Sequence, residues 1–212
     1  AYSHAAMDSI NSAFSVLAVC TGNICRSPAV EHLLRSALGE DASVRVASAG
    51  THALVGHPVA GPMAALLHSR GIDTSGFSAR QLAVPMLADA DLVLALTRQH
   101  RSAIVTEQPR ALRRTFTLRE FARLVASGAA PVPEAGGAAS SGTGSAASIE
   151  AGTAAERLAR LVDQAGARRG SHGHEPILDD VVDPWRRSEA VYAESLRQIT
   201  EALDSIESAL SS

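Results

Sequence analysis

The sequence predicts an α/β fold, a single three-layer domain in which helices flank a four-stranded parallel sheet. Two observations support this prediction. Short apolar runs rich in β-branched residues alternate along the chain with longer segments of helical periodicity, and parallel strands need such helical crossovers. The run at 91–96, DLVLAL, is apolar almost throughout, which is typical of a strand buried on both faces of a sheet. A length of 212 residues favours one domain over two.

The first expected strand covers residues 14–19, and the polar segment 1–13 before it is expected to be loose. A loop at 20–26 leads to Ser27, the expected N-cap of a helix that has Pro28 in its first position. The large apolar side chains of this helix share one face: Val30, Leu33, Leu34 and Leu38.

Further elements are expected along the middle of the chain. In order they are a strand at 44–47, a turn at 48–51, a helix at 62–69, a short helix at 81–88, the strand at 91–96, a helix at 98–105, a strand at 115–117 and a helix at 119–126.

The composition then changes to Ala, Gly, Ser and Pro. We interpret residues 127–175 as a flexible insertion within one domain that spans 14–212, with a single strong helical pattern at 154–164. A last helix is expected at 187–210. Its apolar residues are spaced by four and three, which suits a coiled coil, but packing on the sheet is the preferred interpretation. They are Tyr192, Leu196, Ile199, Leu203, Ile206 and Leu210.

All nineteen basic residues are arginine, and the chain has no lysine. Pyridoxal-phosphate and Schiff-base enzymes, Walker-type nucleotide sites and protein kinases are therefore excluded, because each needs a lysine. The formal net charge of -3 gives no reason to expect nucleic acid binding. No apolar stretch reaches the ~20 residues of a membrane span, and no signal peptide is apparent. Cys20 and Cys25 form no disulfide framework, so a reducing cytoplasm is expected.

The 20–27 loop, CTGNICRS, joins a buried strand to a helix start, and we expect an anion site there. Gly22 is expected to allow a backbone shape that a β-carbon forbids, and Asn23 to brace the loop from a left-handed conformation. Arg26 supplies a planar fork for two anion oxygens. The expected phosphate-binding groups are those of Thr21, Gly22, Asn23, Ile24, Cys25 and Arg26.

The same positive surroundings favour the thiolate form of Cys20, and the thiolate is the nucleophilic form. The Ser27 hydroxyl is expected to donate a hydrogen bond to that sulfur. An attack on phosphorus also needs an acid for the leaving oxygen. Asp183 is preferred because Pro184 restricts it to extended geometry, while Asp179 and Asp180 remain competitors.

The segment 16–28, VLAVCTGNICRSP, resembles the phosphate loop of the low-molecular-weight protein tyrosine phosphatases, bacterial type included. Asp183-Pro184 followed by an aromatic residue is similar to their general-acid loop. Segments 48–51, 79–82 and 90–94 also resemble family segments in the right order, so the resemblance covers roughly 14–125 and 177–210.

The resemblance implies a phosphotyrosine phosphatase that forms a phosphocysteine intermediate on Cys20. Arg26 and the loop amides would bind the phosphoryl oxygens, and Asp183 would protonate the leaving phenolate and then help to activate water. Ser27 would stabilise the thiolate, and Cys25 matches a second loop cysteine that traps oxidised Cys20 as a reversible disulfide. A small apolar packing role for Cys25 is an equal alternative.

Three departures from the family pattern stand out. His52 and Leu54 occupy the region where an aromatic residue usually flanks the substrate ring, and Trp185 stands where tyrosine or phenylalanine is usual. We hypothesise that Trp185 replaces the lost ring contact. The long Ala/Gly/Ser insertion lengthens the connection that leads to Asp183.

Three alternative functions are compatible with parts of this sequence. A protein-arginine phosphatase of the same fold comes second, because such members tend to carry threonine where this chain has Ile24. An arsenate reductase is disfavoured by the lack of a cysteine after Cys25, and an inactive phosphate-binding module by the intact Cys20, Arg26 and Asp183. The expected partners are a phosphotyrosine protein as substrate and a tyrosine kinase. No nucleic acid, membrane, metal or cofactor is expected, and the expected state is a monomer or weak dimer in the cytoplasm.

Overall fold

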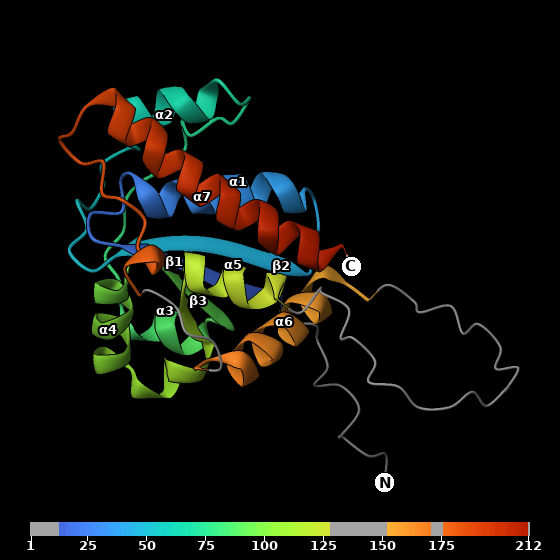
Figure 1. Cartoon of the computed structure of the whole chain (residues 1–212). Coiled ribbons are helices and arrows are strands. Elements are labelled where there is room, and N and C mark those ends of the chain that lie inside the picture. Colours follow the sequence, from blue (N-terminus) through green and yellow to red (C-terminus); the bar gives the residue numbers. More distant parts are fainter. Residues whose placement is uncertain (1–12, 128–151, 171–175, 212) are drawn as a thin grey trace, which may run out of the picture.

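The computed structural model describes residues 13–127, 152–170 and 176–211 (Figure 1). The strands are β1 (Phe14–Cys20), β2 (Val44–Gly50), β3 (Leu92–Ala95) and β4 (Thr115–Thr117). The α-helices are α1 (Arg26–Leu38), α2 (Gly61–His68), α3 (Val84–Asp89), α4 (Arg98–Glu107), α5 (Leu118–Ala126), α6 (Ala154–Arg168) and α7 (Glu189–Leu210). Two 3-10 helices are η2 (Pro109–Arg114) and η3 (Pro176–Asp179).

The four strands form one parallel sheet in the order β2-β1-β3-β4, so the expected α/β fold is confirmed. Cys20 at the end of β1 pairs with Gly50 at the end of β2. The chain order reverses between β1 and β3. In open parallel sheets, ligands bind outside the carboxyl ends of the strands at such a reversal. The fold therefore directs attention to the loop that follows Cys20.

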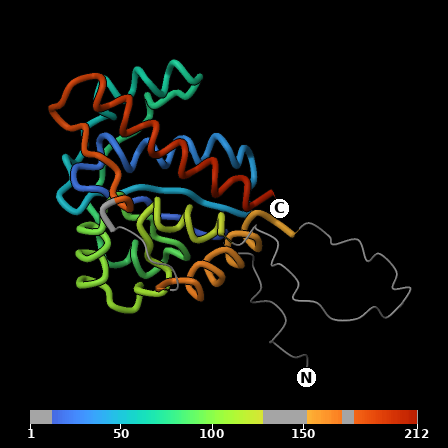
Figure 2. Tube along the Cα trace, in the orientation of Figure 1, coloured from blue at the N-terminus to red at the C-terminus, as the bar shows by residue number. Residues whose placement is uncertain are grey.

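Helices cover both faces of the sheet (Figure 2). Val16 and Ala18 of β1 face a large apolar core built with α1, α2, α5, α6 and α7. Leu17 and Val19 alternate to the opposite face, where they meet Leu87 and Ile104, contributed by α3 and α4. None of the helices in the described residues is both long and apolar enough to span a bilayer.

Helix α6 confirms the helical pattern predicted at 154–164, and its packing shows that this part of the 127–175 range belongs to the folded core instead of a flexible segment. Thr153 and Glu156 form a capping box at its start, and Leu158 and Ala165 are buried against the main core. The helical pattern also continues to Arg168, beyond the predicted end. The remaining parts of the insertion, 128–151 and 171–175, and the N-terminal segment 1–12 lie outside the described residues.

Several predicted boundaries change for tertiary reasons. Residues 48–50, expected in a turn, extend β2 because they pair with β1 up to Cys20. The helix expected at 81–88 is α3, which begins at Val84, because Gln81 instead bridges to Gly50. The last helix begins at Glu189. All six of its spaced apolar residues are buried in the domain, so packing on the core is confirmed over an exposed coiled-coil seam.

Candidate active site

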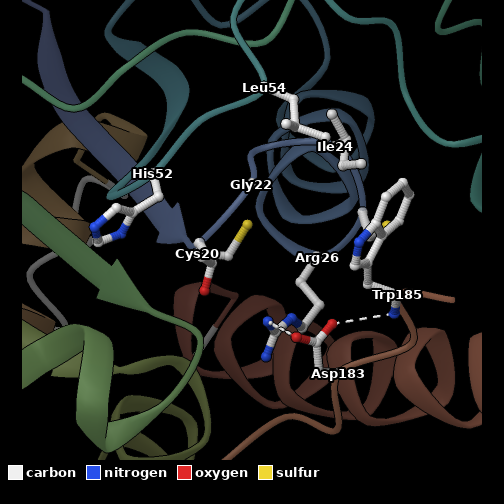
Figure 3. Close-up of a pocket in the computed structure, with 10 residues that line it drawn as sticks. Cys20, Gly22, Ile24, Arg26, His52, Leu54, Asp183 and Trp185 are labelled. Atoms are coloured by element: carbon white, nitrogen blue, oxygen red, sulfur yellow. Dashed lines mark hydrogen bonds and ion pairs between the residues drawn. The ribbon is translucent and has the colours of Figure 1, made fainter.

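A pocket with a volume of about 170 Å³ opens at the carboxyl end of β1 (Figure 3). The 20–27 loop forms its floor, and residues from two distant segments form its walls. Its lining residues are Cys20, Thr21, Gly22, Ile24, Cys25, Arg26, His52, Leu54, Asp183 and Trp185. The structure thus brings the nucleophile, arginine and acid predicted from the sequence into one pocket.

The backbone of the 20–27 loop is held from outside by residues 51–60. The carbonyls of Cys20, Thr21, Gly22 and Ile24 accept hydrogen bonds of 2.7–3.0 Å from backbone N–H groups of that segment. In a planar trans peptide the carbonyl and the following N–H point in opposite directions. Turning the carbonyls outward therefore turns the N–H groups toward the pocket, which is the arrangement an oxyanion needs.

Helix α1 starts directly from this loop. Its N-cap residue is Cys25, and no side chain in the described residues caps this end. Ser27, expected as the N-cap, is the second residue of the helix instead. The free N–H groups and the positive end of the α1 dipole therefore remain available to an anion.

Asn23 braces the loop from within. It is fully buried and left-handed, with φ of 53°, as expected for an asparagine in a tight loop. Its amide nitrogen donates to the Ser27 hydroxyl at 2.9 Å and to the Ser48 hydroxyl at 2.8 Å, and its oxygen accepts from the Arg80 N–H at 2.9 Å. These bonds tie the loop to β2 and to the segment before α3.

The Ser27 hydroxyl oxygen lies 3.0 Å from the sulfur of Cys20. This oxygen accepts from Asn23, and its own proton has two acceptors within reach, the sulfur at 3.0 Å and the Ala49 carbonyl at 3.4 Å, of which the sulfur is nearer. A hydroxyl that donates to sulfur stabilises the thiolate. The geometry agrees with the role expected for Ser27.

A buried carboxylate, that of Glu31, extends the hydrogen-bond network that holds Asn23 and Ser27. Glu31 of α1 is 1% exposed and accepts from the Ser48 hydroxyl at 2.5 Å. Arg35 and Arg80 pair with it at 2.8 and 3.3 Å. The hydrogen-bond chain from Cys20 therefore runs through four further side chains to two arginines at the surface, and sequence reasoning gave Glu31 no role.

The three candidate acids have different partners in the structure. The Asp183 carboxylate lies 2.8 Å from the Arg26 guanidinium, which also donates to the Val181 carbonyl at 3.2 Å. Asp179 pairs with Arg123, and Asp180 accepts from the backbone N–H of Arg98 at 2.7 Å. Of the three, Asp183 alone lines the pocket.

Apolar side chains form one wall of the pocket. Figure 3 draws Ile24, Leu54 and Trp185 on the same side of the loop, with His52 on the other. Trp185 is 43% exposed and Leu54 39% exposed, so both present apolar surface at the mouth. The backbone N–H of Trp185 donates to the Asp183 carboxylate at 3.1 Å, and this bond fixes the turn that carries both residues.

Besides Glu31, two further residues with structural roles at the site were not predicted from the sequence. His100 is 6% exposed, and its Nε2 lies 2.8 Å from the Thr21 hydroxyl. Gly50 touches the loop so closely that a β-carbon there would lie 2.4 Å from the Thr21 carbonyl oxygen. The available signals were the helix start at Thr97 for His100 and the strand-terminal position of Gly50.

The expectation for Gly22 is corrected. The left-handed conformation belongs to Asn23, and a β-carbon on Gly22 would make only an ordinary contact of 3.5 Å with Ile24. Gly22 lines the pocket, so a side chain there would occupy the space above the loop.

Cys25 is buried, and its thiol lies 3.8 Å from the Tyr192 hydroxyl. Burial raises the pKa of Cys25 to about 11, and it also raises the pKa of Tyr192 to about 12. Both groups therefore stay protonated at neutral pH. Both described cysteines, Cys20 and Cys25, are free thiols.

Comparisons with known proteins agree with this geometry. Residues 15–140 match the family described as low molecular weight phosphotyrosine protein phosphatase. The low molecular weight protein-tyrosine-phosphatase Etp of Escherichia coli (strain K12) is 40% identical over 107 residues, which cover 50% of this chain and 70% of Etp. The protein-arginine-phosphatase of Bacillus subtilis (strain 168) is 36% identical over 107 residues, covering 50% of this chain and 71% of that protein.

The YwlE arginine phosphatase from Geobacillus stearothermophilus resembles the whole domain, with a TM-score of 0.63 and 24% identity over 93% of each chain. This likeness shows that the two proteins share a fold.

Proposed function

The chain belongs to the low molecular weight phosphotyrosine protein phosphatase family, and from this we propose that it hydrolyses phosphotyrosine in proteins through a phosphocysteine intermediate. One observation supports this most directly. The Cys20 sulfur, 3.0 Å from the Ser27 hydroxyl, shares a single small pocket with the Arg26–Asp183 ion pair. Nucleophile, anion clamp and acid are the three groups that this reaction requires.

In the first step, the Cys20 thiolate attacks phosphorus, so that an S–P bond forms as the bond from phosphorus to the phenolic oxygen breaks. The loop N–H groups and Arg26 hold the equatorial oxygens, where negative charge is spread in the transition state. Asp183, which takes up a proton from solvent once the substrate phosphate has replaced it on Arg26, gives that proton to the departing phenolate oxygen.

In the second step, a water molecule attacks the phosphocysteine on the face that the phenol has left. The Asp183 carboxylate takes a proton from this water, the S–P bond breaks, and inorganic phosphate leaves with the Cys20 thiolate restored. Ser27 donates to the thiolate both before attack and after its release. Atoms and charge balance over the two steps without a metal or cofactor.

Asp183 and a substrate phosphate are rivals for Arg26. The doubly charged phosphate is the stronger partner because it also meets the loop N–H groups and the α1 dipole. Substrate therefore replaces the carboxylate on the guanidinium and leaves the acid above the loop, near the leaving oxygen.

The apolar wall supports an aryl ester as substrate. Ile24, Leu54 and Trp185 provide flat or branched apolar surface for a phenyl ring. A phosphoarginine substrate would instead bring a guanidinium, and Asp183 is the sole carboxylate in the described lining. The similarity to protein-arginine-phosphatase keeps this second activity as the alternative to be tested.

Cys25 is proposed as a reversible trap for oxidised Cys20, since both line the same pocket. Its thiol is not activated at neutral pH, so attack on a sulfenic acid at Cys20 would need deprotonation during the reaction. We also propose a bacterial, cytoplasmic protein with a tyrosine kinase as counterpart, and the bacterial source of the relatives supports the first of these points.

The experiment is steady-state kinetics on phosphotyrosine, phosphoserine and phosphoarginine peptides of one sequence, with Cys20→Ser and Asp183→Asn beside the wild type. We expect a preference for phosphotyrosine and no turnover in Cys20→Ser. Undiminished turnover in Cys20→Ser would disprove the mechanism. A preference for phosphoarginine would overturn the proposal that phosphotyrosine is the substrate.

A further inference from the structure

The segment 96–100, which follows β3 and includes the start of α4, contacts both loops that carry the proposed chemistry. We propose that this segment is a brace that fixes the distance between the 20–27 loop and the loop at 180–185, with Asp180 and His100 as its positioning residues. The inference deepens the proposed function and rests on it. Figure 1 shows α4 and the short orange helix η3, which ends just before Asp180, at the same edge of the sheet.

The backbone of a single residue joins the two sides. The Leu96 N–H donates to the Val19 carbonyl at 2.9 Å, and Val19 immediately precedes Cys20. The Leu96 carbonyl accepts from the Val181 N–H, also at 2.9 Å, two residues before Asp183. Leu96 directly follows β3 and is fully buried, so it holds both loops in a fixed position relative to the sheet.

On the acid side, Asp180 engages the first turn of α4. Its carboxylate accepts the backbone N–H of Arg98 at 2.7 Å, and the Arg98 side chain approaches the same carboxylate at 3.4 and 3.5 Å. Arg98 is the first residue of α4, where N–H groups lack a partner inside the helix and the dipole favours an anion. The Asp180 carbonyl accepts in turn from Arg119 of α5 at 3.2 Å.

On the nucleophile side, His100 engages the 20–27 loop. Its Nε2 lies 2.8 Å from the Thr21 hydroxyl and its Nδ1 lies 2.9 Å from the hydroxyl of Thr97, the N-cap of α4. Thr97 accepts the His100 backbone N–H at 3.2 Å, so its proton is free to reach Nδ1. This pattern favours a neutral ring that donates from Nε2 to Thr21.

Burial and, to a smaller extent, the nearby Arg26 guanidinium together lower the pKa of His100 to about 4. The ring therefore stays neutral throughout the pH range in which the phosphatase would work. A neutral, fully bonded histidine adds no charge beside the phosphate, and it holds Thr21 in place.

The proposed brace predicts that the loss of activity depends on the leaving group of the substrate, which a general loss of protein stability does not predict. A displaced acid slows the reaction chiefly when the leaving phenolate needs a proton, so the defect should depend on the leaving group. Phenyl phosphate has a strongly basic leaving group, whereas dinitrophenyl phosphate has a weakly basic one that departs unaided. The ratio of kcat/KM for these two substrates is the readout, because kcat/KM reports formation of the phosphocysteine.

For Asp180→Ala we expect kcat/KM on phenyl phosphate to fall about tenfold more than on dinitrophenyl phosphate. Asp180→Asn keeps the acceptor for the Arg98 N–H and should retain nearly the wild-type ratio. Arg98→Pro removes that N–H while keeping a residue suited to the first helical position, so it should reproduce Asp180→Ala. Adding Asp180→Ala to Asp183→Asn should not change the ratio further.

Asp179→Ala is the matched control. It deletes a neighbouring carboxylate that pairs with an arginine on α5 instead of α4. We expect it to reduce stability without changing the ratio of the two substrates. An equal change in Asp179→Ala and Asp180→Ala would overturn the brace, as would a wild-type ratio in Asp180→Ala and Arg98→Pro.

The nucleophile side is tested by inhibition with inorganic phosphate. His100→Ala should raise the inhibition constant about fivefold, with Thr21→Val adding little to it, and His100→Gln should restore part of the binding. An unchanged constant in His100→Ala would remove His100 from the proposal. A wild type that hydrolyses neither aryl phosphate would overturn the proposed function and this inference with it. If the wild type is active, the variants test the role of segment 96–100 separately from the proposed function.

Discussion

The Arg26 guanidinium, whose side chain is 5% exposed, lies 2.8 Å from the Asp183 carboxylate, whose side chain is 54% exposed. The nearly buried Arg26 cation thus holds the exposed Asp183 side chain at the mouth of the pocket. The pair joins the start of α1 to the loop that precedes α7, and phosphate must compete with it.

This competition predicts opposite effects of Asp183→Asn on binding and on catalysis. Inorganic phosphate should bind at least as tightly, because an uncharged amide leaves Arg26 to the anion. On phenyl phosphate, kcat/KM should fall about 100-fold or more, because the proton donor is lost. Inhibition constants and steady-state kinetics on the same preparations provide both values, and weaker phosphate binding would contradict the competition.

Asn23 should be important for both stability and activity. Asn23→Ala removes three hydrogen bonds, two of them buried, and places alanine at a φ of 53°, so we expect a loss of about 3 kcal/mol in unfolding free energy. Asn23→Gly removes the same hydrogen bonds but accepts the backbone conformation. Urea unfolding of both variants separates the two effects, and equal stability would show that backbone strain contributes nothing.

Gly50 should tolerate no side chain. A β-carbon there would lie 2.4 Å from the Thr21 carbonyl oxygen and 3.0 Å from the Asn23 nitrogen, both of which are backbone atoms. Gly50→Ala should therefore destabilise the protein by about 2 kcal/mol and lower kcat/KM by displacing the loop. Gly76→Ala, where the β-carbon meets nothing within 4 Å, is the control. Thermal melts and kinetics on an aryl phosphate would test this, and a normal Gly50→Ala enzyme would contradict it.

His100 should make stability depend on pH below neutrality. Its pKa in the folded protein is about 4, against 6.5 for an ordinary histidine, so the folded state binds the proton less readily than the unfolded state. The resulting stability is fully present above 6.5 and is lost as the pH falls toward 4. The charged groups that affect the ring are Arg26, which opposes protonation, and Asp183 and Asp180, which favour it.

Between pH 7 and 4.5, this term should reduce the unfolding free energy of the wild type by about 2 kcal/mol. In His100→Gln that part of the pH dependence should vanish, whereas His57→Gln, at an exposed position, should retain it. Urea unfolding at the two pH values measures the difference. An identical pH dependence in His100→Gln and the wild type would show that the ring is not the source.

Trp185 should contribute to binding of the substrate ring. It lines the pocket and is 43% exposed, so its indole is available for stacking. Trp185→Ala should raise KM several-fold for aryl phosphates and far less for small alkyl phosphates. Comparison of the two substrate classes tests this, and equal effects on both would refute a ring contact.

Sequence alone predicted the nucleophile and the anion site that we propose, because all their parts fall within eight consecutive residues. A buried strand, a tight loop, an arginine and a helix start follow one another directly, and such local patterns are set by local sterics and capping. The sheet, too, could be predicted from apolar runs and helical spacing. Where the expectations failed, as at the end of β2, pairing with a neighbouring strand overrode the local signal for a turn.

The tertiary structure decided what lies around that loop. Three aspartates of one segment were candidates in the sequence, with Asp183 preferred for the proline that follows it, and packing against Arg26, Arg98 and Arg123 gave each a different partner. His100 and Gly50 carry no local motif, since their importance comes from contact with a loop distant in sequence. Local propensity acts over a few residues, whereas these contacts depend on how the sheet orders its strands and which helix starts meet at its carboxyl edge.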